Sequence, residues 1–344
     1  MKSILSFLTL LLFTGTLFAQ DDKTPYQTIS LKDKKITEAY VRTSGGYIHA
    51  NGADADPRVE VYIRGNSNNK KWSQEEIQSL LNENYELTVT TDNGKVTATA
   101  RNKKNIRDWK KSLSISFKLY LPATVSTDFV TSGGSIQLSD FKGGNHDFTT
   151  SGGSLRVERV DAKVNGVTSG GSIYADQVAK DITLTTSGGS IEAKNSNGRI
   201  RLTTSGGSLT LQQLNGDIGA TTSGGSIKGN NIDGTLAAHT SGGSITMDNI
   251  SGNLNTGTSG GHVSVKMVRL DKYVNVHTSA GGITLDLPQG QAMDLDLSGN
   301  KIETDRLEDF SGRIDRDRVE GKLKGGGAKI EARANSGRLN LKFH

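Results

Sequence analysis

Residues 186–203 read TSGGSIEAKNSNGRIRLT, and residues 204–221 repeat the design as TSGGSLTLQQLNGDIGAT. The Thr-Ser-Gly-Gly element returns every 18 residues between Thr150 and Thr258, after a step of 19 residues and before a step of 20. Copies begin at Thr43, Thr131, Thr150, Thr168, Thr186, Thr204, Thr222, Thr240 and Thr258, and a Thr-Ser-Ala-Gly-Gly variant begins at Thr278. Self-similarity at a fixed period of this length indicates a repeat architecture, in which each unit packs on its neighbours.

Aliphatic residues form columns through the aligned repeats. Five positions after the repeat threonine stand Leu155, Ile173, Ile191, Leu209, Ile227, Ile245 and Val263. Nine positions further stand Val164, Ile182, Ile200, Ile218, Leu236 and Leu254, and a third column holds Val160, Val178, Leu214, Ile232 and Ile250, with Ser196 as its exception. These residues alternate with polar ones, which is the period-two pattern of half-buried strands. We therefore expect at least two short strands in every repeat.

Stacking such repeats about 4.8 Å apart places aliphatic side chains on one another and builds a continuous interior. The sequence thus predicts an all-β protein, a parallel β-solenoid (β-helix) of about 18 residues per coil, with two main strands plus corners. The general rule for parallel crossovers favours a right-handed coil. We expect the Gly-Gly pair to turn the corner because glycine adopts positive φ without penalty. Threonine and serine hydroxyls are expected to stack along the same corner.

Four parts are expected along the chain. They are a signal peptide (1–19), divergent N-terminal coils with inserted strands (20–130), the regular Thr-Ser-Gly-Gly solenoid (131–297) and divergent C-terminal coils (298–344). The first part has Lys2 before an apolar run over residues 4–13 and Ala19 before the cleavage point, which is the layout of a secretory signal. We therefore expect an exported protein that is periplasmic, on the cell surface or extracellular.

The N-terminal and C-terminal parts also contain two insertions and three degenerate repeats. Ser73 and Glu76 have capping-box spacing, so we expect a helix over about 73–81 that covers an open coil edge. Residues 303–324 mix acidic and basic residues and are expected to form a charged cap loop, which protects an end strand from aggregation. Segments 91–98 and 298–302 resemble the start of a coil, and 335–341 resembles the second half of one.

Composition argues against several classes of protein. The chain has no cysteine, which excludes disulfides, thiol catalysis, cysteine-ligated metals and a lipidated cysteine. Its net charge is +5 with both signs interspersed, so it lacks the basic footprint of a nucleic-acid binder. After the N-terminal apolar run, no stretch approaches the roughly 20 apolar residues of a membrane span. We expect no nucleic-acid partner and no transmembrane segment in the mature chain.

No pattern of catalytic residues emerges from the repeats. Eight positions after the repeat threonine stand Glu158, Asp176, Lys194, Gln212, Asn230, Asp248 and Lys266, and thirteen positions after it stand Lys163, Asp181, Arg199, Asp217, Thr235 and Asn253. Mixed charges are typical of a solvated face, whereas cleavage of polysaccharides needs clustered carboxylates or bases. Serine and threonine recur in every coil, although a catalytic nucleophile would be unique. We expect no catalytic residue, no cofactor and no enzyme activity.

Metal and sugar sites find little support in the sequence. Calcium-binding β-rolls repeat an aspartate with their glycines, and this chain has the glycines without the periodic aspartate, so we expect no metal site. His239, His262 and His277 lie near repeat turns and are interpreted as surface histidines. Most aromatic residues precede Thr131, where packing in the core or cap explains them. No ligand-binding residue is identified.

The repeated Thr-Ser-Gly-Gly-Ser-Ile, the lead-in FKLYLP at 117–122 and the closing GRLNL at 337–341 carry a family likeness. Together they resemble the bacterial putative-adhesin family of β-strand-repeat proteins, a domain of unknown function. The resemblance covers nearly the whole mature chain and implies an envelope or extracellular solenoid, with no family ligand or catalytic residue to carry over. We expect an adhesin of the cell envelope or surface whose partner is an unknown protein or glycan. The alternatives are a periplasmic structural scaffold and a carbohydrate-active β-helix enzyme.

Overall fold

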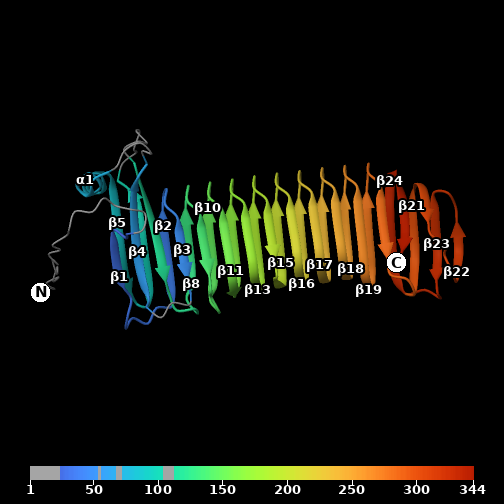
Figure 1. Ribbon diagram of the computed structural model, residues 1–344, viewed down its shortest axis with the longest axis horizontal. Coiled ribbons are helices and arrows are strands. Elements are labelled where there is room, and N and C mark those ends of the chain that lie inside the picture. The colour runs from blue at the N-terminus through green and yellow to red at the C-terminus, as the bar shows by residue number, and fades with distance from the viewer. Residues whose placement is uncertain (1–23, 53–55, 67–71, 104–111) are drawn as a thin grey trace, which may run out of the picture.

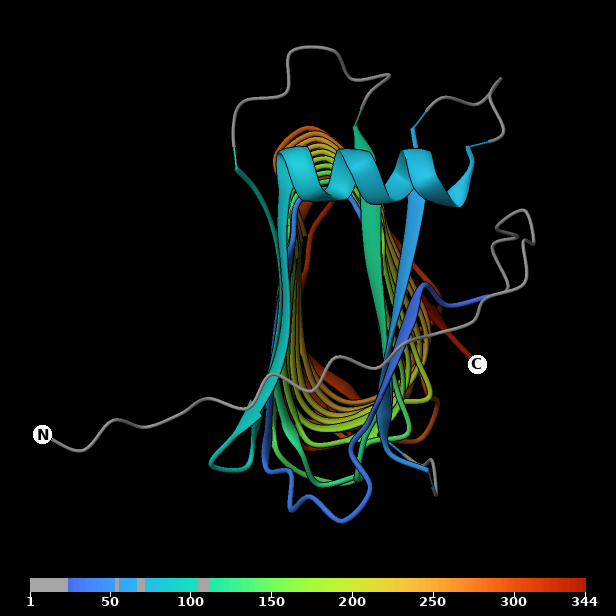
Figure 2. The same ribbon diagram turned by 90° about the vertical axis from the view of Figure 1, so that its left-hand side faces the viewer.

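The computed structural model describes residues 24–52, 56–66, 72–103 and 112–344. In this part of the chain it is a long rod of β-strands with one α-helix near the N-terminal end (Figure 1). The expected all-β class is therefore confirmed. Along the rod axis, two long walls of strands face each other and curved corners join them (Figure 2). The expected signal peptide over 1–19 lies outside the described residues.

The middle of the rod is a regular stack of parallel strands. These are β8 (Ser126–Thr131), β9 (Ile136–Ser139), β10 (Asn145–Thr150), β11 (Leu155–Asp161), β12 (Lys163–Thr168), β13 (Ile173–Thr186), β14 (Ile191–Lys194), β15 (Asn197–Thr204), β16 (Leu209–Thr222), β17 (Ile227–Thr240), β18 (Ile245–Thr258), β19 (Val263–Thr278) and β20 (Ile283–Leu287). Ile200 pairs with Ile182 on one side and Ile218 on the other, which are its counterparts in the adjacent repeats. We call the wall that contains β14 the first wall and the wall that contains β15 the second wall.

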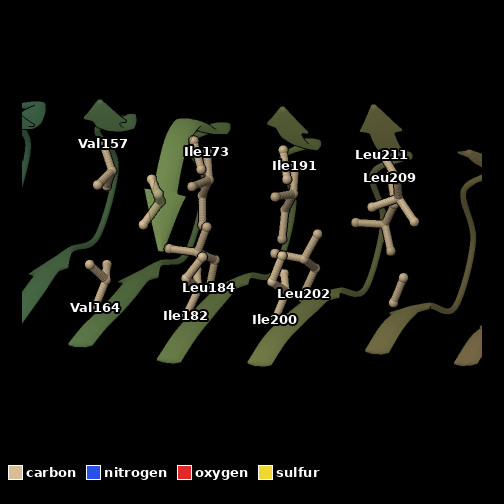
Figure 3. Packing of buried hydrophobic residues seen from close by; sticks show 14 of the residues in the cluster. Val157, Val164, Ile173, Ile182, Leu184, Ile191, Ile200, Leu202, Leu209 and Leu211 are labelled. Carbon is tan, nitrogen blue, oxygen red and sulfur yellow. The ribbon is translucent and has the colours of Figure 1, made fainter. Parts of the chain in front are cut away.

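The predicted aliphatic columns fill the space between the two walls. Ile173 and Ile191 on the first wall point toward Ile182 and Ile200 on the second wall (Figure 3). All four side chains are at most 2% exposed, and the columns continue into one buried cluster along the rod. Burial of this aliphatic surface is the main source of stability, because a single repeat has no partner on which to bury it.

Ser196 is the polar exception in the third column, and local hydrogen bonds explain it. Its side chain is 2% exposed. The hydroxyl donates to the carbonyl oxygen of Lys194 at 2.6 Å and accepts from the N–H of Val178 at 3.1 Å. A buried hydroxyl is tolerated when both its donor and its acceptor capacity are used.

The Thr-Ser-Gly-Gly corner is built by close approach between coils. None of its glycines has a positive φ among the described residues, so the prediction that conformational freedom selects them is wrong. A Cβ on Gly207 would lie 2.0 Å from the carbonyl oxygen of Gly189, whereas one on Gly206 would meet nothing nearer than 3.6 Å. The Thr204 hydroxyl donates to that Gly189 oxygen at 2.7 Å and accepts from the N–H of Gly207 at 3.3 Å. Threonine hydroxyls therefore bond to backbone atoms of the corner.

Positive φ occurs instead at the opposite corner. Nine positions after the repeat threonine, residues in the left-handed region are Arg159, Gln177, Asn195, Gln213, Asn231 and Asn249. Three positions later Gly198 has a φ of 112°, and Gly216, Gly234 and Gly252 follow it in register. Lys180 holds a φ of 78° at the same place in the preceding coil. Glycine is favoured there because a side chain raises the energy of this conformation.

The first wall changes from parallel to antiparallel pairing at its N-terminal end. Beyond β9 the order is β3 (Ile48–Asn51), β7 (Leu113–Tyr120), β4 (Arg58–Gly65) and β1 (Gln27–Ser30). The β4 strand runs antiparallel to both of its neighbours. The wall thus ends in strands that belong to no repeat.

The second wall ends in a hairpin. Beyond β8 the order is β2 (Glu38–Thr43), β6 (Lys95–Asn102) and β5 (Tyr85–Asp92), and the last two are antiparallel. Asn93 and Gly94 form the turn with φ values of 48° and 77°. The prediction of a coil start over 91–98 is therefore wrong, because the Asn-Gly pair makes a two-residue hairpin turn.

Helix α1 (Gln74–Asn84) lies across the N-terminal end of the rod (Figure 2). The N–H of Glu76 donates to Ser73 Oγ at 3.2 Å, and the Glu76 carboxylate accepts from the N–H of Ser73 at 3.0 Å, which confirms the capping box. The helix ends three residues later than predicted. Ile77 and Leu81 are buried against β4, β5 and β7. Among the described residues, no helix combines the length and apolarity that crossing a membrane requires.

The last strand of the chain is not the last strand of the rod. β24 (Ala328–Phe343) inserts between β19 and β21 (Met293–Thr304), and its second half also pairs with β20. A Cβ on Gly337 would lie 1.9 Å from the Gly281 carbonyl oxygen, so Gly337 stacks as a corner glycine. Residues 335–341 therefore hold a corner and the strand after it. The prediction of a second half-coil there is wrong. Ser-Gly-Arg-Leu at 336–339 resembles Asn-Gly-Arg-Ile at 197–200 in sequence, but the first leads into the first wall and the second into the second wall.

The charged segment 303–324 contains a β-hairpin and is not the expected loop. β22 (Phe310–Ile314) and β23 (Arg318–Leu323) are antiparallel, and β23 also pairs antiparallel with β21. The degenerate repeat at 298–302 is a coil start as predicted. Ile302 pairs with Leu339 of β24, which itself pairs with Ile283 at the start of β20. The boundaries of the four expected parts stay predictions.

Candidate functional site

A groove of about 520 Å³ runs along the outside of the first wall beside the Thr-Ser-Gly-Gly corner. It crosses successive coils, from β3 and β9 to β16, rather than following one strand. Two rows of side chains line it. The serine row is Ser135, Ser154, Ser172, Ser190 and Ser208, and the mixed row is His49, Gln137, Arg156, Tyr174, Glu192 and Thr210. Both rows face outward because they alternate with the buried aliphatic columns.

The serine row carries one hydroxyl group per coil. The N–H of Ser208 donates to Ser190 Oγ at 3.1 Å, and the N–H of Ser190 donates to Ser172 Oγ at 3.3 Å. Ser226 and Ser244 continue these links beyond the groove. The side-chain oxygens of Ser172, Ser190, Ser208 and Ser226 therefore each accept a hydrogen bond within the protein. No residue in the described ranges accepts a hydrogen bond from these hydroxyls, so each can donate outward.

The mixed row is polar, and its charges are balanced locally. Arg156 pairs with Glu158 at 2.5 Å, and Glu192 pairs with Lys194 at 2.6 Å. The Arg156 guanidinium also lies 4.4 Å from the centroid of the Tyr174 ring, which is a cation–π contact. This part of the groove therefore presents hydrogen-bonding groups and one aromatic ring without an excess of either charge.

Aromatic rings gather at the N-terminal end of the groove. Tyr47 takes the register position of Ser135, and its ring lies 4.4 Å from the His49 ring and 6.4 Å from the Tyr62 ring. Lys118 Nζ lies 4.6 Å from the Tyr62 centroid. We expected tyrosines in this region to pack in the core or cap. That prediction is wrong for Tyr47 and Tyr62, because both stand at outward positions and are half-buried.

The His49 imidazole and the Tyr62 phenol of this cluster are uncharged at neutral pH. Burial, together with the nearby Lys118 charge, lowers the pKa of His49 to about 4. Burial and the hydrogen bond to Glu60 raise the pKa of Tyr62. Neither side chain therefore contributes charge to this end of the groove at neutral pH.

The two polar columns considered for catalysis lie on different walls. On the first wall Glu158 and Asp176 are adjacent, so the sign of charge does not alternate there. Each carboxylate has its own partner: Glu158 pairs with Arg156, and Asp176 accepts a hydrogen bond from Asn195 at 2.7 Å. On the second wall Asp181 lies beside Arg199 at 3.8 Å. Within the described ranges, no three histidine, aspartate or glutamate side chains gather as metal ligands. The absence of catalysis and of a metal stays a prediction.

The structure places His262 apart from His239 and His277, the other two histidines near repeat turns. His239 and His277 flank Gly257 on the second wall, where a Cβ on that glycine would lie 3.7 Å from His239 Nδ1 and 3.5 Å from His277 Cβ. His262 follows the corner onto the first wall, and its Nε2 lies 3.3 Å from Thr284 Oγ1. The three side chains therefore form no common site.

The serine row and the pair Tyr47 and Tyr62, which we call the tyrosine cluster, do not stand out in the sequence as a site. The serine one position before each first-wall aliphatic residue is visible in the repeat, but the pattern does not show that its hydroxyl lines a groove. The proximity of Tyr47 and Tyr62 is not visible in the sequence, because it depends on β7, a distant strand that pairs with β3 on one side and with β4 on the other.

Residues 200–342 match the family model described as Toastrack DUF4097. This segment includes the second half of the regular stack and the C-terminal end, and it supports a β-repeat domain of unknown function there. No curated protein matches the chain.

Three solved structures are similar over most of the chain. A putative cell adhesion protein from Clostridium sporogenes has 8% identity and a TM-score of 0.23, covering 92% of this chain and 97% of that one. A putative adhesin from Bacteroides fragilis has 12% identity and a TM-score of 0.27, covering 92% and 96%. A putative lipid binding protein from Parabacteroides distasonis has 12% identity and a TM-score of 0.24, covering 92% and 96%.

Proposed function

We propose that this chain is an exported β-solenoid interaction protein, an adhesin of the bacterial cell envelope or surface, and that the groove of the first wall is its binding face. The observation that carries the proposal is the serine row, which repeats one outward hydroxyl per coil along the groove. A repeated polar row on a rigid rod suits recognition of an extended partner.

Repetition also argues against an enzyme. Catalysis needs a base, acid or nucleophile that differs from its surroundings in position and pKa. In the groove, Arg156 and Glu192 are each paired with a neighbouring charge, and the hydroxyls recur with the coil. We therefore propose that the protein binds without chemical conversion. Incubation with neutral and uronate polysaccharides should release no new reducing ends, and their appearance would contradict this part of the proposal.

The same proposal includes two further points. The coil is right-handed, and nearly the whole mature chain belongs to the adhesin family. Right-handedness rests on the rule for parallel crossovers. Family membership rests on the Thr-Ser-Gly-Gly repeats and on the family match over residues 200–342.

The location of the protein tests the adhesin role. Intact native cells are treated with protease, an osmotically shocked sample serves as the control, and the protein is detected with an antibody. The proposal predicts that it is degraded on intact cells. Protection until shock would contradict surface exposure and would favour the alternative, a periplasmic structural scaffold.

A further inference from the structure

We propose that the groove binds a neutral linear glycan that lies along the rod axis, with sugar hydroxyls on the serine row and sugar rings against the tyrosine cluster. This inference rests on the proposed function, because it names the class of partner for the same groove.

The hydroxyls of Ser172, Ser190 and Ser208 are oriented donors. Ser172 and Ser190 each accept the N–H of the serine in the following coil, at 3.3 and 3.1 Å. These bonds hold the oxygen and leave the hydroxyl hydrogen for a ligand. Sugar hydroxyl and ring oxygens are acceptors of the required kind.

The spacing of the donors favours a polymer. Adjacent coils are about 4.8 Å apart, so the row from Ser135 to Ser208 extends over about 19 Å. A small ligand would use one or two of these positions. A linear glycan repeats its hydroxyls from one sugar to the next and can use the whole row.

An extended peptide fits this groove poorly. A peptide binds a sheet by adding a strand to a free edge, where main-chain groups are unpaired. The groove crosses coils whose strands already pair on both sides, as β14 does with β13 and β16. The donors that remain are side-chain hydroxyls, which suit a glycan.

The tyrosine cluster supplies surface for sugar rings. Tyr47 occupies the serine register at the end of the row, and Tyr62 lies 6.4 Å from it, centroid to centroid. Farther along, Tyr174 lines the groove itself. Tyrosine combines a large apolar face with a polar tip, and this combination matches the apolar face and hydroxyl rim of a sugar.

The charge of the groove selects among glycans. Arg156 and Glu192 are neutralised by Glu158 and Lys194, and His49 is uncharged at neutral pH because its pKa is lowered to about 4. An acidic polysaccharide would find no net positive charge on such a surface to compensate the desolvation of its carboxylates. A neutral glycan needs no such compensation.

Binding of cello-, xylo- and chito-oligosaccharides of two to six units to the purified mature protein tests the inference by calorimetry. We expect affinity that rises with chain length for at least one series. Replacement of Ser172, Ser190 and Ser208 by alanine together should weaken it about tenfold or more, because three donors are lost. The matched control replaces Ser169, Ser187 and Ser205, which stand in the same corners outside the groove, and should leave affinity unchanged.

The melting temperature of both triple variants separates binding from folding. If they melt alike and only the groove variant loses affinity, the inference is supported. Tyr174→Ala serves as a second variant and should also weaken binding. Absence of binding to every neutral oligosaccharide, preference for polygalacturonate, or equal loss in both triple variants would overturn the inference. Surface exposure with no glycan binding would leave the proposed function standing.

Discussion

The regular stack and the two ends of the rod are specified in different ways. In the stack a residue meets its counterpart 18 positions away, so one short pattern places the core, the corner and the serine row. At the ends β4, β5, β22 and β23 pair antiparallel, and β24 enters between strands that precede it in the chain. Repetition thus defines the middle through near neighbours, whereas the ends depend on contacts between unrelated segments.

The largest effect is expected from a charge in the core of the stack. Ile200 is fully buried between Ile182 and Ile218, so Ile200→Asp would place an unpaired carboxylate among aliphatic side chains. We expect a loss of about 4 kcal/mol or more in the free energy of unfolding, measured with urea. Thr203→Asp on the exposed side of the same strand should cost less than about 1 kcal/mol. Similar losses in the two variants would show that the column is not interior.

A matched pair of glycines tests how closely the coils approach. A Cβ on Gly207 would lie 2.0 Å from the Gly189 oxygen, and one on Gly206 would meet nothing within 3.5 Å. Gly207→Ala should therefore destabilise by about 3 kcal/mol, because the coils must separate locally. Gly206→Ala should change stability by less than about 1 kcal/mol. If the two variants had the same melting temperature, close stacking of the coils would not explain why the second position of the Gly-Gly pair is glycine.

His146 lies at the junction between the irregular end and the regular stack, and it should make stability depend on pH. Its side chain is 1% exposed, and its ring nitrogens lie 3.0 Å from Thr127 Oγ1 and 2.9 Å from the Gly143 oxygen. Burial lowers its pKa to about 4, below the value of about 6.5 in an unfolded chain. The unfolded state then binds more protons, so stability falls as pH decreases from about 6.5 to about 4, by up to about 3 kcal/mol.

The control for this pH effect comes from the next coil, where Val164 stands in the register position of His146. A Thr127→Val/His146→Val double variant removes the imidazole and its hydroxyl partner together. Urea unfolding at pH 7.5 and pH 4.5 should show a smaller difference in this variant than in the wild-type protein. An unchanged difference would mean that other groups cause it.

The smallest effect is expected at the N-terminal cap. Ser73→Ala removes the side-chain acceptor of the Glu76 N–H in the capping box. Replacement of an N-cap serine costs about 1 kcal/mol of helix stability. Hydrogen exchange should therefore accelerate in α1 and stay unchanged in β13–β19, because repeats contact only their neighbours. Faster exchange throughout the stack would show that the helix supports the whole rod.

The sequence predicted the stack because its signals are periodic and local. The columns through Ile191 and Ile200, the polar faces and the helix start at Ser73 all follow from short patterns. The register of β24 could not be read, because its pairing with β19 and β21 depends on where a distant strand inserts. The tyrosine cluster escaped prediction for the same reason. The prediction that positive φ selects the corner glycines was wrong. Those glycines are needed because adjacent coils approach closely, and this distance between coils cannot be read from a local sequence pattern.

The coil register supports both the core and the groove, and it can be measured directly. The chain has no cysteine, so spin labels attach only to introduced ones. Thr149 reaches Thr221 in four register steps and His277 in seven. At about 4.8 Å per coil, the Thr149→Cys/Thr221→Cys and Thr149→Cys/His277→Cys pairs should give electron spin distances centred near 19 and 34 Å. A difference of about 14 Å between the pairs is the predicted result, and equal distances or a reversed order would contradict the stacked register.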